Sequence, residues 1–147
     1  MNIRPVAPND LMAWAQMRNE LWPDSLNQHQ QELEAFFLGK QFDIDYAYVL
    51  ELDNAELAGF IEINIRDYAE GATSSPIPYL EAWYVSDGHR HLGYGQSLIR
   101  FFEQWSKNKG FKEIASDTTL DNQRSIDLHK RLGFEETERV VCFVKKL

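Results

Sequence analysis

The chain reads Arg90-His91-Leu92-Gly93-Tyr94-Gly95 directly after a strand-like run and directly before an amphipathic helical segment. Two glycines one residue apart let the backbone turn tightly and approach a ligand closely. The free N–H groups of the first helical turn then point to one spot, where the helix dipole favours negative charge. The stretch lacks the third glycine of the dinucleotide fingerprint and the Gly-Lys-Ser/Thr of a P-loop. It predicts a pyrophosphate site, with a simple glycine-eased helix start as the alternative.

Hydrophobic spacing on either side of this turn predicts an α/β domain with a mixed sheet. Strands are expected at residues 2–7, 46–50, 57–65, 79–85 and 113–118, and helices at 10–21, 27–38, 93–109 and 124–132. The residues Asp53-Asn54 suit the turn of a β-hairpin between the second and third strands. Two short final strands are expected around Gly133-Phe134 and over 140–144.

The charge of the chain is unevenly distributed. Of its 147 residues, 44% are hydrophobic and 26% are charged, as in an ordinary single globular domain. Residues 1–82 carry 14 Asp and Glu against 4 Lys and Arg, whereas residues 83–147 carry 9 against 11, which together give the net charge of −8. The first half therefore repels nucleic acid and anionic lipid and attracts cations. An acidic surface that only keeps the protein soluble is the alternative.

The chain shows no membrane or secretion signal. No apolar run approaches the roughly 20 residues that cross a bilayer, and the opening Met1-Asn2-Ile3-Arg4-Pro5 lacks the apolar stretch of a signal peptide. The single cysteine, Cys142, excludes an internal disulfide and suits a reducing compartment. We expect a cytoplasmic protein without nucleic-acid or membrane partners.

Three segments accompany the glycine turn, namely Trp83-Tyr84-Val85 before it, and Asn122 and Leu132-Gly133-Phe134 after it. With Arg-x-x-Gly-x-Gly they resemble the GNAT acetyltransferase superfamily over nearly the whole chain. The resemblance implies a single domain, 1–147, with a mixed, splayed central sheet flanked by helices, and acetyl-coenzyme A as cosubstrate. It implies a backbone N–H near Val85 that stabilises the oxyanion formed from the thioester. It assigns coenzyme A contacts to Trp83, Tyr84, Val85, Arg90, His91, Leu92, Gly93, Tyr94, Gly95, Gln96 and Asn122. Asn122 is also a natural helix-start residue.

Other segments resemble the aminoglycoside 6'-N-acetyltransferases within this superfamily. They are residues 20–23, 67–71, 79–85, 115–118 and 132–140. This resemblance implies an aminoglycoside as the acceptor, a homodimer, and acceptor contacts at Trp22, Tyr68, Glu81, Asp117 and Glu138. The composition agrees, because a polycationic sugar needs carboxylates and flat apolar surfaces. Alternatively, Trp22 is a core aromatic and Tyr68 a loop residue, and Glu70 is a reserve candidate in the same loop.

The reaction needs a group that accepts a proton. An amine resembling that of lysine has a pKa near 10.4, so about one molecule in 10³ is neutral at pH 7 and able to attack the thioester. Glu81 is the first candidate base, because it lies in the strand that carries the oxyanion donor, on the face opposite Leu80 and Ala82. Asp117, near the end of the next strand, is the second. A strand-end salt bridge is the ordinary alternative role for either.

The leaving thiolate needs less help, because an alkyl thiol has a pKa near 8.5. Many members of the superfamily place a tyrosine four residues before the Gly-Phe glycine as the general acid, and here His129 takes that position. His129 is therefore a candidate acid or a half-buried helix residue. Direct transfer in a ternary complex is expected.

No metal is expected, because His29, His89, His91 and Cys142 lack the spacing of metal ligands. Cys142 is expected in the core of an apolar final strand rather than as a nucleophile. Two alternatives remain open at this point. One is an acetyltransferase that acts on a protein or polyamine amine, and the other is a coenzyme A-binding module without catalysis.

Overall fold

The structure, a computed structural model, describes residues 1–40 and 43–147. Within them a single sheet has the strand order β1-β2-β3-β4-β5. Its strands are β1 (Asn2–Pro5), β2 (Tyr46–Glu51), β3 (Leu57–Arg66), β4 (Ile77–Val85) and β5 (Ala115–Ser116). The helices are α1 (Leu11–Leu21), α2 (Leu26–Phe37), α3 (Tyr94–Asn108) and α4 (Gln123–Arg131), with the short 3-10 turns η1 (Pro8–Asp10) and η2 (Asp87–His89).

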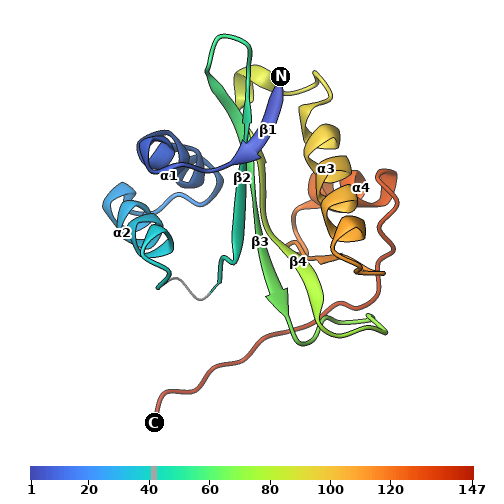
Figure 1. Cartoon of the computed structure of the whole chain (residues 1–147). Helices are drawn as coiled ribbons and strands as arrows, with labels where there is room; N and C mark the ends of the chain where they lie inside the picture. The colour runs from blue at the N-terminus through green and yellow to red at the C-terminus, as the bar shows by residue number, and fades with distance from the viewer. Residues whose placement is uncertain (41–42) are drawn as a thin grey trace.

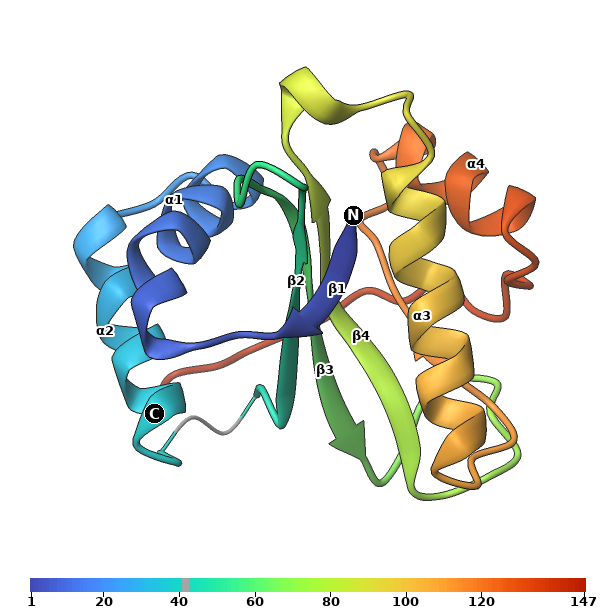
Figure 2. The ribbon, with the colours of Figure 1, turned by 45° about the horizontal axis from the view of Figure 1, so that its top comes forward.

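The helices cover the sheet on both faces. Figures 1 and 2 show α1 and α2 on one face and α3 and α4 on the other. Trp14, Leu33 and Phe60 belong to the apolar cluster under α1 and α2, and Leu80 and Phe102 to the cluster under α3. Among the described residues, none of the helices combines the length and apolar character needed to span a bilayer. The predicted α/β class and mixed sheet are confirmed.

The last two strands, β4 and β5, pair over only two residues each. β1 to β4 pair antiparallel along most of their length, whereas the parallel pairing of β4 with β5 covers only Tyr79↔Ala115 and Leu80↔Ser116. Beyond Leu80 the two strands diverge, so the backbone of 81–85 has an open edge. The predicted splay is present, and β5 is shorter than the predicted 113–118.

A β-bulge lies in β4 at Glu81. Glu62 pairs with Ala82 and Ile63 with Leu80, so Glu81 has no partner in β3. Because a bulge changes the alternation of side chains, Leu80 packs under α3 while Ala82 packs under α1 and α2. The expectation that Leu80 and Ala82 share one face was therefore wrong.

The two predicted final strands are absent from the structure. The chain after α4 has no strand pairing, and Figures 1 and 2 show it crossing from the side of α4 to the side of α2. Phe143 and Val144 are 91% and 94% exposed, and Cys142 is exposed rather than in a core. A two-residue β5 offers this apolar segment little edge to pair with inside one copy of the chain.

A buried ion pair joins the helical layer to the sheet. The fully buried Glu62 of β3 accepts a hydrogen bond from Trp14 Nε1 at 3.0 Å and lies 3.1 Å from Arg18 Nε. Arg18 also binds Glu32 of α2 at 2.9 Å. Burial raises the pKa of Glu62 to about 7, although Arg18 and Trp14 oppose this effect.

This raised pKa predicts a stability that depends on pH. Between about pH 4.5 and 7 the folded protein keeps a proton on Glu62 that the unfolded chain releases. The stabilisation from this proton is complete below pH 4.5 and is lost as the pH rises through 7. Relative to Glu62→Gln, the free energy of unfolding of the wild type should fall by roughly 3 kcal/mol over this range, as measured by denaturant titration at stepped pH. The control Glu34→Gln changes an exposed carboxylate of the same helix α2 and should keep the slope. A wild type with the same slope as Glu62→Gln would contradict the prediction.

Candidate functional site

The glycine turn leads from η2 into α3 through two left-handed residues. His91 has φ +65° and Gly93 has φ +84°, and Gly93 is the N-cap of α3. Ser97 N donates to the carbonyl of Gly93 at 3.0 Å, which closes the first helical turn. The N–H groups of residues 94–96 have no acceptor within the helix. Free N–H groups at a helix start are suited to an anion, which is the site that the sequence analysis expects here.

The side chains around this turn hold it against the end of β4. Arg90 Nε donates to the carbonyl of Val85 at 3.0 Å, and Arg90 Nη1 binds Asp87 at 2.5 Å. Trp83 Nε1 donates to the carbonyl of Gly95 at 3.2 Å, and a Cβ on Gly95 would lie 3.4 Å from the indole ring. Gly95 therefore permits a close approach of the helix to this tryptophan.

The other predicted coenzyme A contacts differ in position. The side chain of Tyr84 lies on the opposite face of β4, where its hydroxyl donates to Glu20, and burial raises its pKa to about 12. Only the backbone of Tyr84 borders the open edge. Leu92 and Gln96 are exposed beside the turn. The Asn122 side chain caps α4 by accepting from Ser125 N at 3.1 Å, which is the helix-start role.

The open edge and the turn together fit coenzyme A. The unpaired backbone of 81–85 can pair with an extended amide-containing chain such as pantetheine, as a missing strand would. The free N–H groups at the start of α3 follow the open edge of 81–85 and suit a diphosphate. An open backbone edge and an anion site therefore occur in the order in which that molecule presents its pantetheine arm and its diphosphate.

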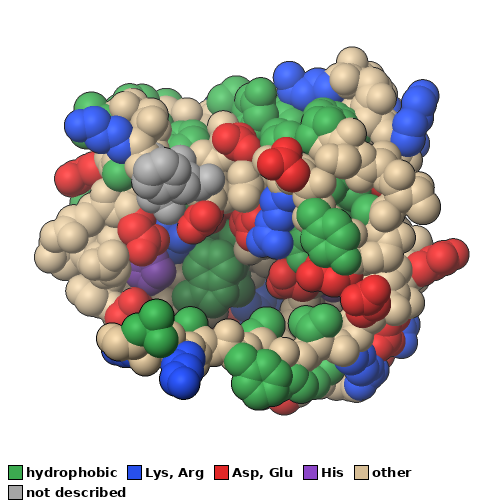
Figure 3. Space-filling view, turned by 90° about the horizontal axis from the view of Figure 1, so that it is seen from below, with side chains coloured by type: hydrophobic (Ala, Val, Ile, Leu, Met, Phe, Trp, Pro, Cys, Tyr) green, Lys and Arg blue, Asp and Glu red, His purple; other side chains and the backbone are tan. Residues whose placement is uncertain are grey.

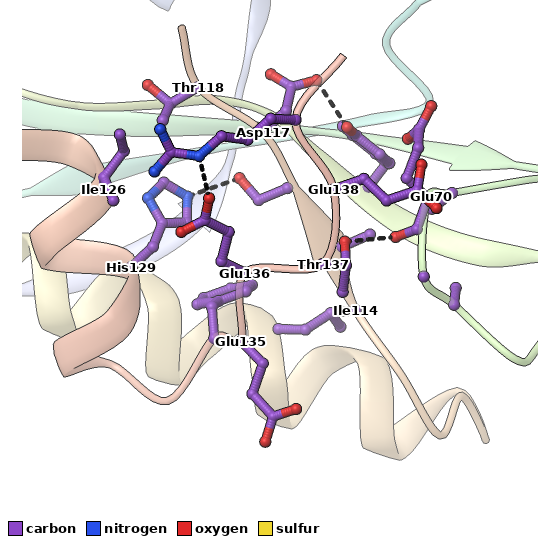
Figure 4. Close-up of a pocket in the computed structure, with 18 of the residues that line it drawn as sticks. Glu70, Ile114, Asp117, Thr118, Ile126, His129, Glu135, Glu136, Thr137 and Glu138 are labelled. Carbon is purple, nitrogen blue, oxygen red and sulfur yellow. Dashed lines mark hydrogen bonds and ion pairs between the residues drawn. The ribbon is translucent and has the colours of Figure 1, made fainter. Parts of the chain in front are cut away.

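Four of the five predicted acceptor residues line two cavities. Trp22 and Glu81 border a cavity of about 360 Å³ together with Arg18, Glu32 and Glu62. Asp117 and Glu138 border a cavity of about 1080 Å³, where Figure 4 shows them with Glu70 and His129. Tyr68 borders neither cavity and is 66% exposed. Figure 3 shows acidic side chains gathered around a hollow on this face of the molecule.

Trp22 stands at the end of α1, where two neighbours orient it. His29 Nε2 donates to its carbonyl at 3.0 Å, and the Arg18 guanidinium lies 5.4 Å from the centre of its ring. Trp22 is 40% exposed, so it presents a flat surface rather than filling the core. This arrangement suits the face of a sugar ring.

Arg66, which the sequence analysis did not single out, lies between the two carboxylates expected to act as bases. It borders both cavities and binds Glu81 through two hydrogen bonds of 2.7 Å, from Nε and Nη2. Its guanidinium lies over the Tyr79 ring at 3.5 Å, and the Tyr79 hydroxyl donates to Asp117 at 2.6 Å. Burial and this hydrogen bond raise the pKa of Tyr79, which keeps the hydroxyl protonated. Glu81 and Asp117 thus face separate cavities and are linked through Arg66 and Tyr79.

His129 lies beside the last paired residue of β5. Its Nδ1 is 2.7 Å from the carbonyl of Ser125, so Nδ1 carries a proton, and Nε2 of the neutral ring then accepts from Ser116 Oγ at 2.8 Å. Trp83 and Phe134 contact the ring edge-on. These contacts hold the imidazole in one orientation beside Ser116, where the pairing of β4 with β5 ends.

The structure offers no metal site in the part of the chain that it describes, because no group of three or more His, Cys, Asp or Glu side chains is arranged to hold an ion.

Comparisons with known proteins agree with this geometry. Residues 14–134 match the family model described as Acetyltransferase (GNAT) family. An aminoglycoside N(6')-acetyltransferase type 1 from Klebsiella aerogenes is 39% identical over 99% of this chain and 96% of its own length. The relative of the same name from Acinetobacter haemolyticus is also 39% identical, over 100% and 99%.

Solved structures give the same result. The apo aminoglycoside antibiotic 6'-N-acetyltransferase from Acinetobacter haemolyticus superposes with a TM-score of 0.86 at 37% identity, covering 100% of this chain and 99% of the other. The enzyme AAC(6')-Iy, in complex with the bisubstrate analog CoA-S-monomethyl-acetylneamine, superposes with a TM-score of 0.85 at 34% identity, covering 99% and 98%. The chain belongs to the GNAT acetyltransferase family and, within it, to the aminoglycoside 6'-N-acetyltransferases.

Proposed function

We propose that this protein transfers the acetyl group of acetyl-coenzyme A directly to the 6'-amine of an aminoglycoside. The observation that carries the proposal is the position of Glu81. It lies at the bulge of β4, next to the open backbone edge and inside a cavity bordered by Trp22. A thioester held along that edge would therefore meet an amine held by carboxylates. The relatives named above bear this activity in their names.

At the cosubstrate end, this chain supplies shape and N–H donors. The turn from Arg90 to Gln96 would bind the diphosphate, and the edge from Trp83 to Val85 would bind the pantetheine arm, with Asn122 nearby. Acetyl-coenzyme A brings an activated acyl group. A backbone N–H near Val85 would stabilise the negative charge that develops on its carbonyl oxygen.

At the acceptor end, carboxylates would bind ammonium groups and aromatic rings would cover sugar faces. Glu81 and Trp22, which border the smaller cavity, and Asp117 and Glu138, which border the larger one, would make these contacts. Tyr68 would reach the acceptor from the exposed loop after β3. The acidic first half of the chain raises the local concentration of a polycation.

Proton transfer would begin at a carboxylate. Glu81 or Asp117, directly or through a water molecule, would accept the proton that the amine must lose before it attacks. His129 would provide the proton for the thiolate only from its imidazolium form, in which Nε2 also carries a proton, because in the neutral ring Nε2 accepts from Ser116 and Nδ1 donates to Ser125. These roles complete a direct transfer without an acetyl-enzyme.

An acceptor panel tests the proposal. Coenzyme A release should be detected with kanamycin or tobramycin, which carry a free 6'-amine, at rates well above those with spermidine or a lysine peptide. Turnover with only spermidine or peptides would assign the protein to the polyamine or protein acetyltransferases. Tight coenzyme A binding with no turnover on any acceptor would identify a binding module.

The glycine turn predicts a selective loss of cosubstrate binding. Gly93 has φ +84°, and a Cβ at this position would meet open space, so Gly93→Ala acts through backbone strain rather than through a clash. An L residue in this region costs about 1 kcal/mol or more, which should weaken acetyl-coenzyme A binding about fivefold or more by calorimetry. Gly110, at the other end of α3, has φ +88° and the same open space. Gly110→Ala is thus a matched control that should keep the affinity. Equal affinity in both folded variants would show that the turn does not bind the cosubstrate.

We further propose that the protein is a homodimer in the cytoplasm. The single Cys142 is compatible with a reducing compartment. The dimer is supported by the exposed apolar residues Val140, Val141, Phe143 and Val144, of which the first two border the large cavity. Another copy of the chain could cover these side chains and extend the sheet.

Sedimentation equilibrium should therefore give about twice the mass of one chain. Phe143→Asp should shift the protein toward the monomer, because a charge at this position opposes burial in an interface. Met12→Asp, which changes an exposed apolar residue of α1, should leave the mass unchanged. A monomeric wild type at micromolar concentration would contradict the proposal.

A further inference from the structure

The position of Arg66 bears on acceptor binding as well as on the ion pair with Glu81. It is the last residue of β3, and its side chain reaches across to the bulge of β4. It is about two-thirds buried, and its partner Glu81 is more deeply buried. The hydrogen bond from this guanidinium to Glu81 raises the pKa of Arg66, so the cation is permanent.

The hydrogen bonds leave one part of Glu81 available. Oε1 accepts from Arg66 Nε at 2.7 Å and from Asn64 Nδ2 at 3.3 Å. Oε2 accepts from Arg66 Nη2 at 2.7 Å. An ionised carboxylate has about four acceptor positions. Three of them are used by described residues, and the fourth, on Oε2, can accept an amine N–H without displacing Arg66.

The same guanidinium links the two cavities. Its Cζ lies over the Tyr79 ring, 3.5 Å from the ring centre, and the Tyr79 hydroxyl donates to Asp117 at 2.6 Å. The Arg66 guanidinium therefore orients Glu81 directly and is connected to Asp117 through Tyr79. It also separates two negative charges that would otherwise repel each other across the site.

We propose that Arg66 is the positioning residue for the acceptor amine. It acts through Glu81 by fixing the plane of the carboxylate, so that Oε2 presents its free acceptor position to the 6'-amine beside the open edge of β4. This role rests on the proposed function. It requires the shape of arginine as well as its charge, because only a guanidinium makes two parallel hydrogen bonds and stacks flat on an aromatic ring.

The competing role is a counter-ion that an incoming ammonium displaces from Glu81. The geometry disfavours this role, because leaving Glu81 would break both parallel hydrogen bonds and the contact with Tyr79 together. The two roles predict opposite changes. A positioning residue, when removed, lowers kcat because the amine is misplaced, whereas a displaced counter-ion, when removed, lowers KM for the acceptor.

The experiment compares Arg66→Met and Arg66→Lys with the wild type in steady-state acetylation of kanamycin. Both variants should lower kcat about 10- to 100-fold, the usual effect of a misplaced reacting group. KM for acetyl-coenzyme A should be unchanged. Arg4 binds Asp10 and Glu51 at the far edge of the sheet, two strands from β3. Arg4→Met therefore removes a comparable ion pair away from the site and should keep kcat near the wild-type value.

A double-mutant cycle shows whether Arg66 acts through Glu81. Glu81→Gln alone should lower kcat by roughly 10²–10⁴. In the Glu81→Gln background, Arg66→Met should lower kcat by less than about threefold, because the carboxylate that it positions is gone. Thermal unfolding of each variant confirms that it is folded.

Three results would overturn the inference. They are a wild-type kcat in Arg66→Met, full rescue of kcat by Arg66→Lys, and additive losses in the cycle. A lower acceptor KM at unchanged kcat would establish the counter-ion role instead. If the wild type acetylates spermidine or a peptide but no aminoglycoside, the proposed function fails, and the cycle run with the accepted amine still decides the role of Arg66.

Discussion

The divergence of β4 from β5 is the constraint on which the rest of this molecule depends. Parallel pairing stops after Leu80 and Ser116, so the following backbone of β4 has donors and acceptors that no strand satisfies. Buried backbone groups need partners, and a long amide-containing ligand can supply them. The bulge at Glu81 lies at the same point and aims a carboxylate at the place where the edge opens. The open edge and the acidic group are thus two results of one local irregularity in the sheet.

Carboxylates and their arginine partners are the second feature that shapes the acceptor side. The acidic first half of the chain surrounds the acceptor side, yet its most buried carboxylates are paired with arginines. Arg18 lies 3.1 Å from Glu62 inside the helical layer, and Arg66 holds Glu81 at the cavity wall. Unpaired charges in such positions would be costly. Pairing lets the site keep a high density of carboxylates for a polycation while each one remains in a defined orientation.

The C-terminal segment shows how the fold and the assembly are connected. Its apolar residues lie outside the core of one copy, although their pattern is that of a strand. Glu136, Thr137 and Glu138 border the larger cavity, with Thr137 donating to the carbonyl of Glu70 at 3.0 Å. The acceptor side is therefore bordered by the segment that leads into the exposed apolar residues. An assembly that covers those residues would also stabilise this wall of the site.

Local patterns in the chain were sufficient to predict the helices, the hairpin, the glycine turn, and the places of Glu81 in β4 and of Asp117 at the end of β5. Each depends on periodicity, on a turn residue or on a family motif within a short stretch. The same patterns could not predict the bulge at Glu81, the position of Arg66 between two cavities or the unpaired final segment. These features depend on how β3 registers against β4 and on which edges remain free, and both are set by contacts between residues far apart in sequence. Arg66 was overlooked for this reason, because an arginine at a strand end has no distinctive local signal until folding brings it to Glu81 and Tyr79.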